Sequence, residues 1–180
     1  MIRAIILAGG RGTRLGDLTK NLPKPLIKVG SKTVLEQIVD RLNLHGIHQI
    51  IINTHYLPVH INQSLELRAL YYHVPRLLGH KGTIFALKDW VKDDYFLTIN
   101  GDTISNVNFS EMLNLKRDDR IIALMDENRC AGTWLYPPEY LTNTQLPIQP
   151  YRPTDLIWHD IGTPERLKEA EEFYKEEQSL

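Results

Sequence analysis

Residues 2–15 read Ile2-Arg3-Ala4-Ile5-Ile6-Leu7-Ala8-Gly9-Gly10-Arg11-Gly12-Thr13-Arg14-Leu15. The run from Ile2 to Leu7 is almost wholly apolar and leads directly to paired glycines. Such a run is typical of a β-strand that is buried on both faces of a parallel sheet. The glycines that follow let the backbone approach a ligand closely and turn successive N–H groups toward one anion. This stretch therefore predicts a buried strand that leads into an anion-binding loop.

Strand and helix patterns alternate along the rest of the chain. Thr33 and Glu36 have the spacing of a capping box, Gly46 follows the last apolar position of that helix, and Pro164 stands at a predicted first helical position. We expect further strands at 49–52, 69–74, 95–99, 120–124, 134–136 and 156–158, and helices at 33–45, after Pro58, at 83–90, after a Ser110 cap and at 163–178. The pattern predicts an α/β fold with an open, mostly parallel, Rossmann-like sheet and helices on both faces. The proline-rich residues 137–153 are predicted to form an irregular surface excursion.

Length and composition predict one compact domain over residues 1–180. The chain has 42% hydrophobic and 24% charged residues, and 21 Lys and Arg against 22 Asp and Glu. A net charge of -1 leaves no basic field for a nucleic acid, so we expect phosphate recognition to be local. One cysteine, Cys130, excludes a disulfide framework and fits a reducing compartment. No apolar run approaches a membrane span, so we expect a cytoplasmic protein without a membrane partner.

Two cations accompany the glycine-rich loop. Arg14 brings a planar guanidinium suited to phosphate oxygens, and Lys24 stands between two prolines that restrict the backbone beside it. Together with the glycines they favour a triphosphate over a single phosphate, although a glycine pair alone would equally suit a simple chain reversal. The P-loop motif is absent, and Leu15 stands where the dinucleotide-binding fingerprint needs its third glycine.

Two aspartates are predicted to lie at the same rim of the sheet as the glycine loop. Asp102 and Asp160 each follow a predicted strand, and ligands of open α/β sheets bind outside the carboxyl ends of the strands. Two carboxylates beside a triphosphate suit Mg²⁺, which takes few protein oxygens and shares its remaining positions with phosphate and water. The alternative for either residue is an ordinary turn or helix-entry aspartate.

These motifs, in this order, resemble the sugar-1-phosphate nucleotidyltransferases, which make nucleoside-diphosphate sugars. The resemblance lies in 7–15 with Pro23-Lys24-Pro25-Leu26, in a second glycine loop at 78–83, in Asn100-Gly101-Asp102 and in Trp158–Glu165. It implies Mg²⁺-dependent transfer of a nucleoside monophosphate from a triphosphate to a sugar-1-phosphate. Asn53–Leu57 resembles a segment of the mannose- and heptose-1-phosphate guanylyltransferases, which favours GTP. The oligomeric state is not readable from the sequence.

The family's residue roles map onto this chain by the same motifs. The resemblance implies that Arg14, Lys24, Asp102 and Asp160 are catalytic, and that Asp102 and Asp160 bind the metal. It implies nucleotide contacts at Leu7, Ala8, Gly9, Gly10, Gly12, Thr13, Arg14, Lys24, Gly82 and Asp102. It implies sugar-phosphate contacts at Asn100 and Gly132.

The resemblance fails in the half that binds the sugar. Relatives carry a Glu-Lys-Pro element whose lysine holds the sugar phosphate, but the predicted strand at 120–124 leads here almost directly to Cys130–Tyr136. Arg129, or Lys28, is expected to replace that lysine. Two alternatives follow from the shortened half: transfer to another phosphorylated acceptor such as phosphocholine, or a catalytically idle nucleotide-binding or regulatory module.

Overall fold

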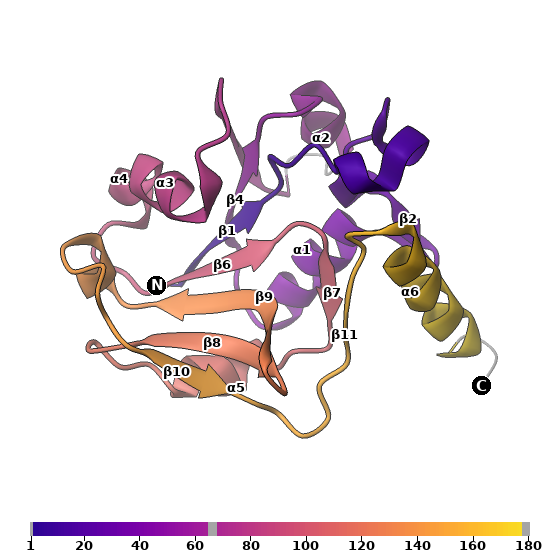
Figure 1. Ribbon diagram of the computed structural model, residues 1–180. Helices are drawn as coiled ribbons and strands as arrows, with labels where there is room; N and C mark the ends of the chain where they lie inside the picture. The colour runs from indigo at the N-terminus through magenta and orange to yellow at the C-terminus, as the bar shows by residue number, and fades with distance from the viewer. Residues whose placement is uncertain (1, 65–67, 178–180) are drawn as a thin grey trace.

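The computed structural model describes residues 2–64 and 68–177, and its centre is a seven-stranded sheet (Figure 1). The strand order is β10-β8-β9-β6-β1-β4-β5. The strands are β1 (Arg3–Leu7), β4 (Gln49–Thr54), β5 (Leu70–His73), β6 (Phe96–Asn100), β8 (Ile121–Asp126), β9 (Arg129–Tyr136) and β10 (Ile148–Tyr151). β9 runs antiparallel to β6 and β8, whereas the other neighbouring strands are parallel. The predicted open, mostly parallel sheet is confirmed.

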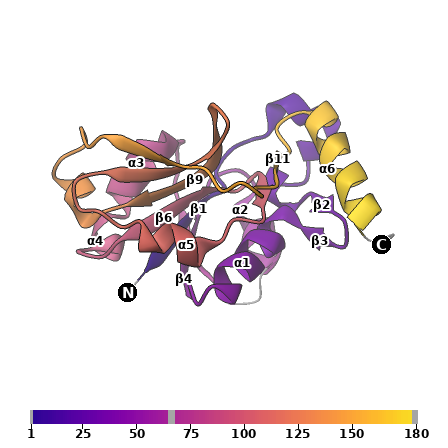
Figure 2. The ribbon, with the colours of Figure 1, turned by 90° about the horizontal axis from the view of Figure 1, so that it is seen from below.

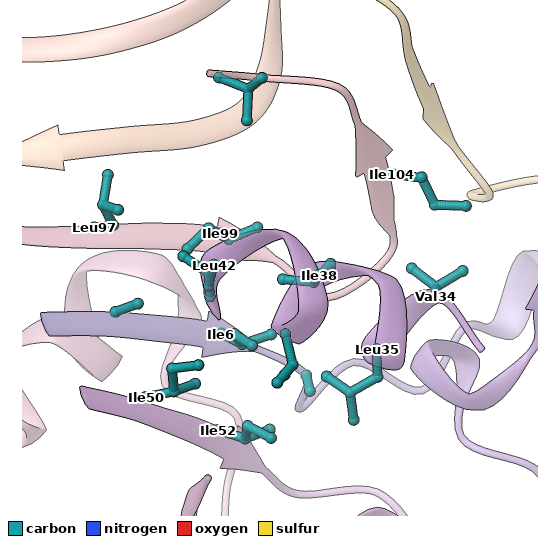
Figure 3. Packing of buried hydrophobic residues seen from close by; sticks show 14 of the residues in the cluster. Ile6, Val34, Leu35, Ile38, Leu42, Ile50, Ile52, Leu97, Ile99 and Ile104 are labelled. Atoms are coloured by element: carbon teal, nitrogen blue, oxygen red, sulfur yellow. The ribbon is translucent and has the colours of Figure 1, made fainter. Parts of the chain in front are cut away.

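Helices cover both faces of this sheet, as predicted. α1 (Val34–Leu44) and α5 (Phe109–Asn114) pack on one face, whereas α3 (Gly79–Ala86) and α4 (Lys88–Val91) pack on the other. In Figure 2, seen from below, α1 and α5 lie on the lower side of the sheet and α6 (Pro164–Glu177) lies at the right; α2 (Pro58–Ser64) follows β4 in the chain. The apolar run at 2–7 is explained by this arrangement, because Ile5 packs with the α3 side and Ile6 with the α1 side. Figure 3 shows Ile6 among the α1 residues that form this core.

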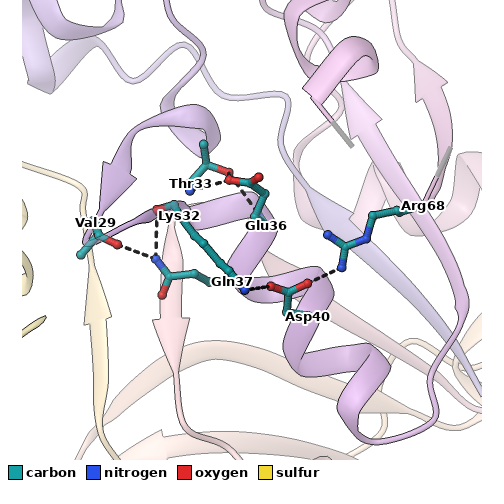
Figure 4. A network of polar contacts seen from close by, with 7 residues as sticks. All are labelled: Val29, Lys32, Thr33, Glu36, Gln37, Asp40 and Arg68. Carbon is teal, nitrogen blue, oxygen red and sulfur yellow. Dashed lines mark hydrogen bonds and ion pairs between the residues drawn. The ribbon is translucent and has the colours of Figure 1, made fainter. Parts of the chain in front are cut away.

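The start of α1 follows from local hydrogen bonds. The Thr33 hydroxyl accepts from the Glu36 N–H at 3.1 Å, and the Glu36 carboxylate accepts from the Thr33 N–H at 2.7 Å. The predicted capping box is therefore confirmed (Figure 4). Those backbone and side-chain hydrogen bonds from Thr33 hold the pKa of Glu36 below its usual range. The helix ends before Gly46, whose φ of 72° only glycine adopts readily.

Two small antiparallel sheets flank the large one. β7 (Thr103–Ser105) pairs with β11 (Trp158–Asp160), and β2 (Lys28–Val29) pairs with β3 (Lys32–Thr33). The β7–β11 pair fixes the distant C-terminal segment beside the turn that follows β6. This pairing was not predicted, because a three-residue strand carries almost no periodic signal.

Several predicted elements differ in detail. Asn108, rather than Ser110, caps α5, since its side chain accepts from the Glu111 N–H at 3.2 Å. The single helix predicted at 83–90 is two helices, α3 and α4, and begins earlier, at Gly79. The excursion at 137–153 contains a 3₁₀ helix, Pro138–Leu141, and the edge strand β10. An edge strand tolerates Pro150 because one side of its backbone needs no partner.

Within the described ranges, no helix is both long enough and apolar enough to cross a membrane.

Candidate active site

The loop after β1 is held against two neighbouring segments. Gly12 adopts a φ of 66°, and its carbonyl accepts from the Leu15 N–H at 2.9 Å and from the Thr19 hydroxyl at 3.0 Å. A Cβ added at Gly12 would lie 3.0 Å from Thr19 Cγ2 and 3.2 Å from Lys24 Cβ. Glycine is thus required here for its backbone conformation and for the close approach of Lys24.

Lys24 reaches the turn that follows β6. It begins the 3₁₀ helix Lys24–Leu26, is only 8% exposed, and forms an ion pair with Asp102 Oδ2. A buried ammonium is strongly destabilising unless an acid pairs with it. The two residues are 78 positions apart in the sequence, so this contact joins the Pro-Lys-Pro segment to the Asn-Gly-Asp turn.

The Asn-Gly-Asp turn lies directly against the first loop. The Gly101 N–H donates to the Leu7 carbonyl at 3.0 Å, and a Cβ added at Gly101 would lie 2.9 Å from that oxygen. Parallel pairing of β1 with β6 brings the two strand ends together, with Leu7 opposite Asn100. Asp102 therefore stands beside the glycine loop because of the register of the sheet.

Asp160 arrives by a different route from the one predicted. It is the last residue of β11, pairs with Thr103 of β7, and is followed by Ile161, whose N–H donates to the Asp102 carbonyl at 3.0 Å. Its position thus depends on the antiparallel β7–β11 pair and not on the end of a parallel strand, which corrects the sequence argument for a common rim. The two aspartates nevertheless lie on neighbouring backbone segments.

Hydrogen bonds keep the Asp160 carboxylate ionised. Oδ1 accepts from the Gly162 N–H at 2.9 Å, and Oδ2 accepts from the Arg166 guanidinium at 2.5 Å. Burial alone would raise the pKa of Asp160, but the hydrogen bonds from Arg166 and Gly162 lower it below its ordinary value. The Arg14 guanidinium also lies nearby, since a Cβ added at Gly162 would lie 3.0 Å from its Nη2.

A cavity of about 350 Å³ collects most of the predicted residues. It is lined by Leu7, Ala8, Gly10, Gly12, Thr13, Arg14, Lys24, Pro25, Asn100, Gly101, Asp102 and Gly162. These residues come from the first loop, the Pro-Lys-Pro segment, the β6 turn and the segment after β11. A larger cavity of about 570 Å³, between α1, β7, β11 and α6, contains none of the predicted site residues. The smaller cavity is thus the candidate active site, because the charged and glycine-rich motifs converge there.

Six predicted residues do not line this cavity, and one of them, Lys28, is exposed in β2. Gly9 packs against Asn53, with 3.0 Å between an added Cβ and Asn53 Oδ1, and Gly82 lies within α3. Gly132 packs behind Asn100, and Asp160 lies beside the lining residue Gly162. The exposed Arg129 guanidinium lies 3.4 Å from Asp126 Oδ2 and 5.3 Å from the centre of the Trp158 ring.

The carboxylate oxygens fit a hard divalent cation. Asp102 and Asp160 carry carboxylate oxygens of the kind that Mg²⁺ prefers, and each forms an ion pair, Asp102 with Lys24 and Asp160 with Arg166. Within the part of the chain that the structure describes, no group of three or more His, Cys, Asp and Glu side chains could hold a metal by itself. Two carboxylates would leave the other positions of a Mg²⁺ octahedron to phosphate oxygens and water.

Arg166 and Gly162 were not predicted as site residues from the sequence. Gly162 lines the cavity and its N–H holds Asp160, while Arg166, in the first turn of α6, pairs with the same carboxylate. The spacing of six residues from Asp160 to Arg166 spans a turn and a helix start, so no simple periodicity could have revealed the pair.

The chain belongs to the family described as "Nucleotidyl transferase", whose model matches residues 3–129. A mannose-1-phosphate guanylyltransferase of Mycobacterium tuberculosis is 29% identical over 125 residues, which cover 66% of this chain and 35% of that protein. A D-glycero-alpha-D-manno-heptose 1-phosphate guanylyltransferase of Campylobacter jejuni is 32% identical over 132 residues, covering 71% of this chain and 59% of that protein. The crystal structure of HddC from Yersinia pseudotuberculosis superposes with a TM-score of 0.81 at 21% identity, covering 97% of this chain and 100% of that one.

The family resemblance found in the sequence is thus confirmed, and the last similarity supports the fold. The chain spans about a third of the length of the first curated relatives, between 27% and 35% for three of them.

Proposed function

We propose that this protein transfers a nucleoside monophosphate from a nucleoside triphosphate to a sugar-1-phosphate, releasing pyrophosphate. One observation carries the proposal: the glycine loop, Arg14, Lys24 and Asp102 line a single cavity although they come from separate segments. Membership in the nucleotidyl transferase family and relatives described as mannose- and heptose-1-phosphate guanylyltransferases support it.

The reaction needs positioning and charge stabilisation more than proton transfer. An anionic oxygen of the sugar phosphate attacks the α-phosphorus in line, and pyrophosphate leaves, so no general base is required. The backbone of Gly10, Gly12 and Thr13 would bind the triphosphate, and Arg14 would pair with its oxygens. Lys24 would add positive charge at the same end of the cavity.

We propose Mg²⁺ as the metal, held by Asp102 and Asp160. When bound there, Mg²⁺ would neutralise the charge that develops on the phosphate oxygens. Lys24 and Arg166 orient the two carboxylates before the metal arrives. An ion pair that first holds a metal ligand in place reduces the ordering that binding requires.

GTP is the triphosphate that we propose, with a mannose- or heptose-type sugar as acceptor. Relatives described as guanylyltransferases support this, and others described as uridylyltransferases and a probable cytidylyltransferase define the alternatives. We further propose that one functional domain spans residues 1–180, beyond the matched 3–129, because the C-terminal segment supplies Asp160, Gly162 and Arg166.

Pyrophosphate release in a panel of four triphosphates and common sugar-1-phosphates, with Mg²⁺, tests the function. Activity is expected with at least one pair, GTP foremost, and it should disappear on chelation with EDTA. Phosphocholine belongs in the same panel, because its use in place of every sugar-1-phosphate would refute the proposed acceptor. Tight triphosphate binding without turnover on any acceptor would identify an idle nucleotide-binding module.

A further inference from the structure

One face of the β6–β9 pair continues from the candidate active site into the core. Thr98 lies opposite Trp134 and Phe96 lies opposite Tyr136 in the register of the two strands. Asn100, two residues beyond Thr98, shares that face, and a Cβ added at Gly132 would lie 3.2 Å from Asn100 Cβ. Side chains therefore follow one another in cross-strand pairs from the cavity inward.

The side chains of these cross-strand pairs become more exposed to solvent toward the cavity. Phe96 is 0% exposed and Tyr136 is 6% exposed, and their rings stack with 5.1 Å between centroids. Trp134 and Asn100, nearer the cavity, are only half-buried. Trp134 does not line the cavity, but it lies one cross-strand pair inward from Asn100, which does. A partly open aromatic side chain at the inner end of a polar cavity can pack against a ligand.

His80 of α3 lies over the middle of this face. Its Nε2 is 2.8 Å from Thr98 Oγ1 and 3.3 Å from the Tyr136 hydroxyl, and its ring centroid is 4.5 Å from that of Trp134. Within the described residues its Nδ1 makes no hydrogen bond, and the ring is half-buried. Because burial lowers the pKa of His80, the ring is neutral at physiological pH and suits an uncharged hydroxyl partner.

We propose that His80 and Trp134 bind the sugar ring of the acceptor and determine which sugar-1-phosphate is used. The apolar C–H face of a sugar would pack on Trp134, and His80 Nδ1 would form a hydrogen bond with a ring hydroxyl. This inference rests on the proposed function. His80 lies in the second glycine loop, and the family resemblance assigns no ligand contact to it or to Trp134. Nε2 is already engaged by Thr98 and Tyr136, so the imidazole is fixed in one orientation before the sugar binds.

The geometry also favours this side of the cavity for the acceptor. On the other side of β1, Gly9 packs against Asn53, and an added Cβ would lie 3.4 Å from His55 Cβ. The triphosphate loop follows β1, and β6 lies between that strand and β9. The sugar would therefore extend over β6 and β9 while its phosphate points to the turn at Asp102.

The test compares steady-state constants of His80→Phe and Trp134→Leu with those of the wild type. His80→Phe keeps a ring and removes the hydrogen bond, so the KM for the sugar-1-phosphate should rise about tenfold while the KM for the triphosphate stays within about twofold. Trp134→Leu should raise the same constant by a similar factor. Both variants should also reduce the preference for the best sugar-1-phosphate over its hydroxyl epimers, because a site that pairs with a hydroxyl rejects analogues that misplace it.

Matched variants separate binding from stability. Trp90→Leu removes another half-buried tryptophan, which lies far from the cavity beside Arg3, and should leave both constants unchanged. His80→Gln, which can still form a hydrogen bond, should recover part of the epimer preference. If either variant is too unstable to assay, quenching of tryptophan fluorescence by the sugar-1-phosphate should persist in Trp90→Phe and be lost in Trp134→Phe.

The outcomes distinguish this inference from the function on which it rests. If folded, active variants keep the wild-type KM for the sugar-1-phosphate and the wild-type epimer preference, the role of His80 and Trp134 is overturned. The proposed function would then still stand. Equal rises in the KM for both substrates would assign these residues a structural role and likewise overturn it. A wild type that makes no nucleotide sugar from any pair would overturn the proposed function together with this inference.

Discussion

Replacing Gly12 by alanine separates two reasons for a glycine at this position. The residue has a φ of 66°, and an added Cβ would lie 3.0 Å from Thr19 Cγ2 and 3.2 Å from Lys24 Cβ. Gly46 has a similar φ of 72°, but a Cβ there would meet nothing within 4 Å. Gly46→Ala is therefore a matched control that carries the backbone strain without the contact.

The free-energy cost of placing alanine in a left-handed backbone conformation is similar in both variants. A left-handed conformation costs a residue with a Cβ about 1–2 kcal/mol, and alanine recovers roughly 0.4–1 kcal/mol by restricting the unfolded chain. The net loss is about 1 kcal/mol, which corresponds to a fall in Tm of about 2–4 °C for a chain of this size. Gly46→Ala should show this fall and nothing else.

Gly12→Ala should lose ligand binding in addition. The new Cβ would displace Lys24 or the loop itself by a few tenths of an ångström. This would disturb both the Lys24–Asp102 ion pair and the loop N–H groups that we propose to bind the triphosphate. We expect the Kd for the triphosphate with Mg²⁺ to rise at least about tenfold, equivalent to about 1.4 kcal/mol. Isothermal titration calorimetry on the two folded variants measures this directly. Equal affinities in Gly12→Ala and Gly46→Ala would refute the argument that the loop cradles the triphosphate.

Four further outcomes are expected. Asp102→Asn should lower turnover about a thousandfold while the protein still folds, measured as pyrophosphate release; near-normal turnover would contradict its role at the metal. Arg129→Ala should raise the KM for the sugar-1-phosphate and leave the KM for the triphosphate unchanged. If neither KM changes, Arg129 has no part in acceptor binding and only contacts Asp126. Thr33→Ala should cost about 1 kcal/mol in chemical denaturation by removing the cap of α1. Burial lowers the pKa of His80, so the free energy of unfolding should fall as the pH drops below about 6.5, and this fall should flatten in His80→Gln.

Local sequence was sufficient for the elements whose causes lie within a few residues. The strand at Arg3–Leu7 follows from a continuous apolar run, and the start of α1 follows from a hydroxyl and a carboxylate three residues apart. The glycine loop was likewise readable, because its backbone conformation requires glycine wherever the loop occurs. The α5 cap was misplaced by two residues because Asn108 and Ser110 are both good caps, and only the path of the chain selects between them.

Only the tertiary structure determined which distant groups meet. The Lys24–Asp102 pair depends on the register of β1 with β6, and the position of Asp160 depends on the antiparallel pairing of β7 with β11. His80 and Trp134 meet because α3 packs on the face of β6 and β9 opposite α1. Register and packing are collective outcomes of the whole core, since a shift of one residue turns every side chain of a strand to the other face. Sequence motifs were therefore sufficient to predict a phosphate-binding loop, whereas the aromatic side chains proposed to hold the sugar came together only through strand pairing and helix packing.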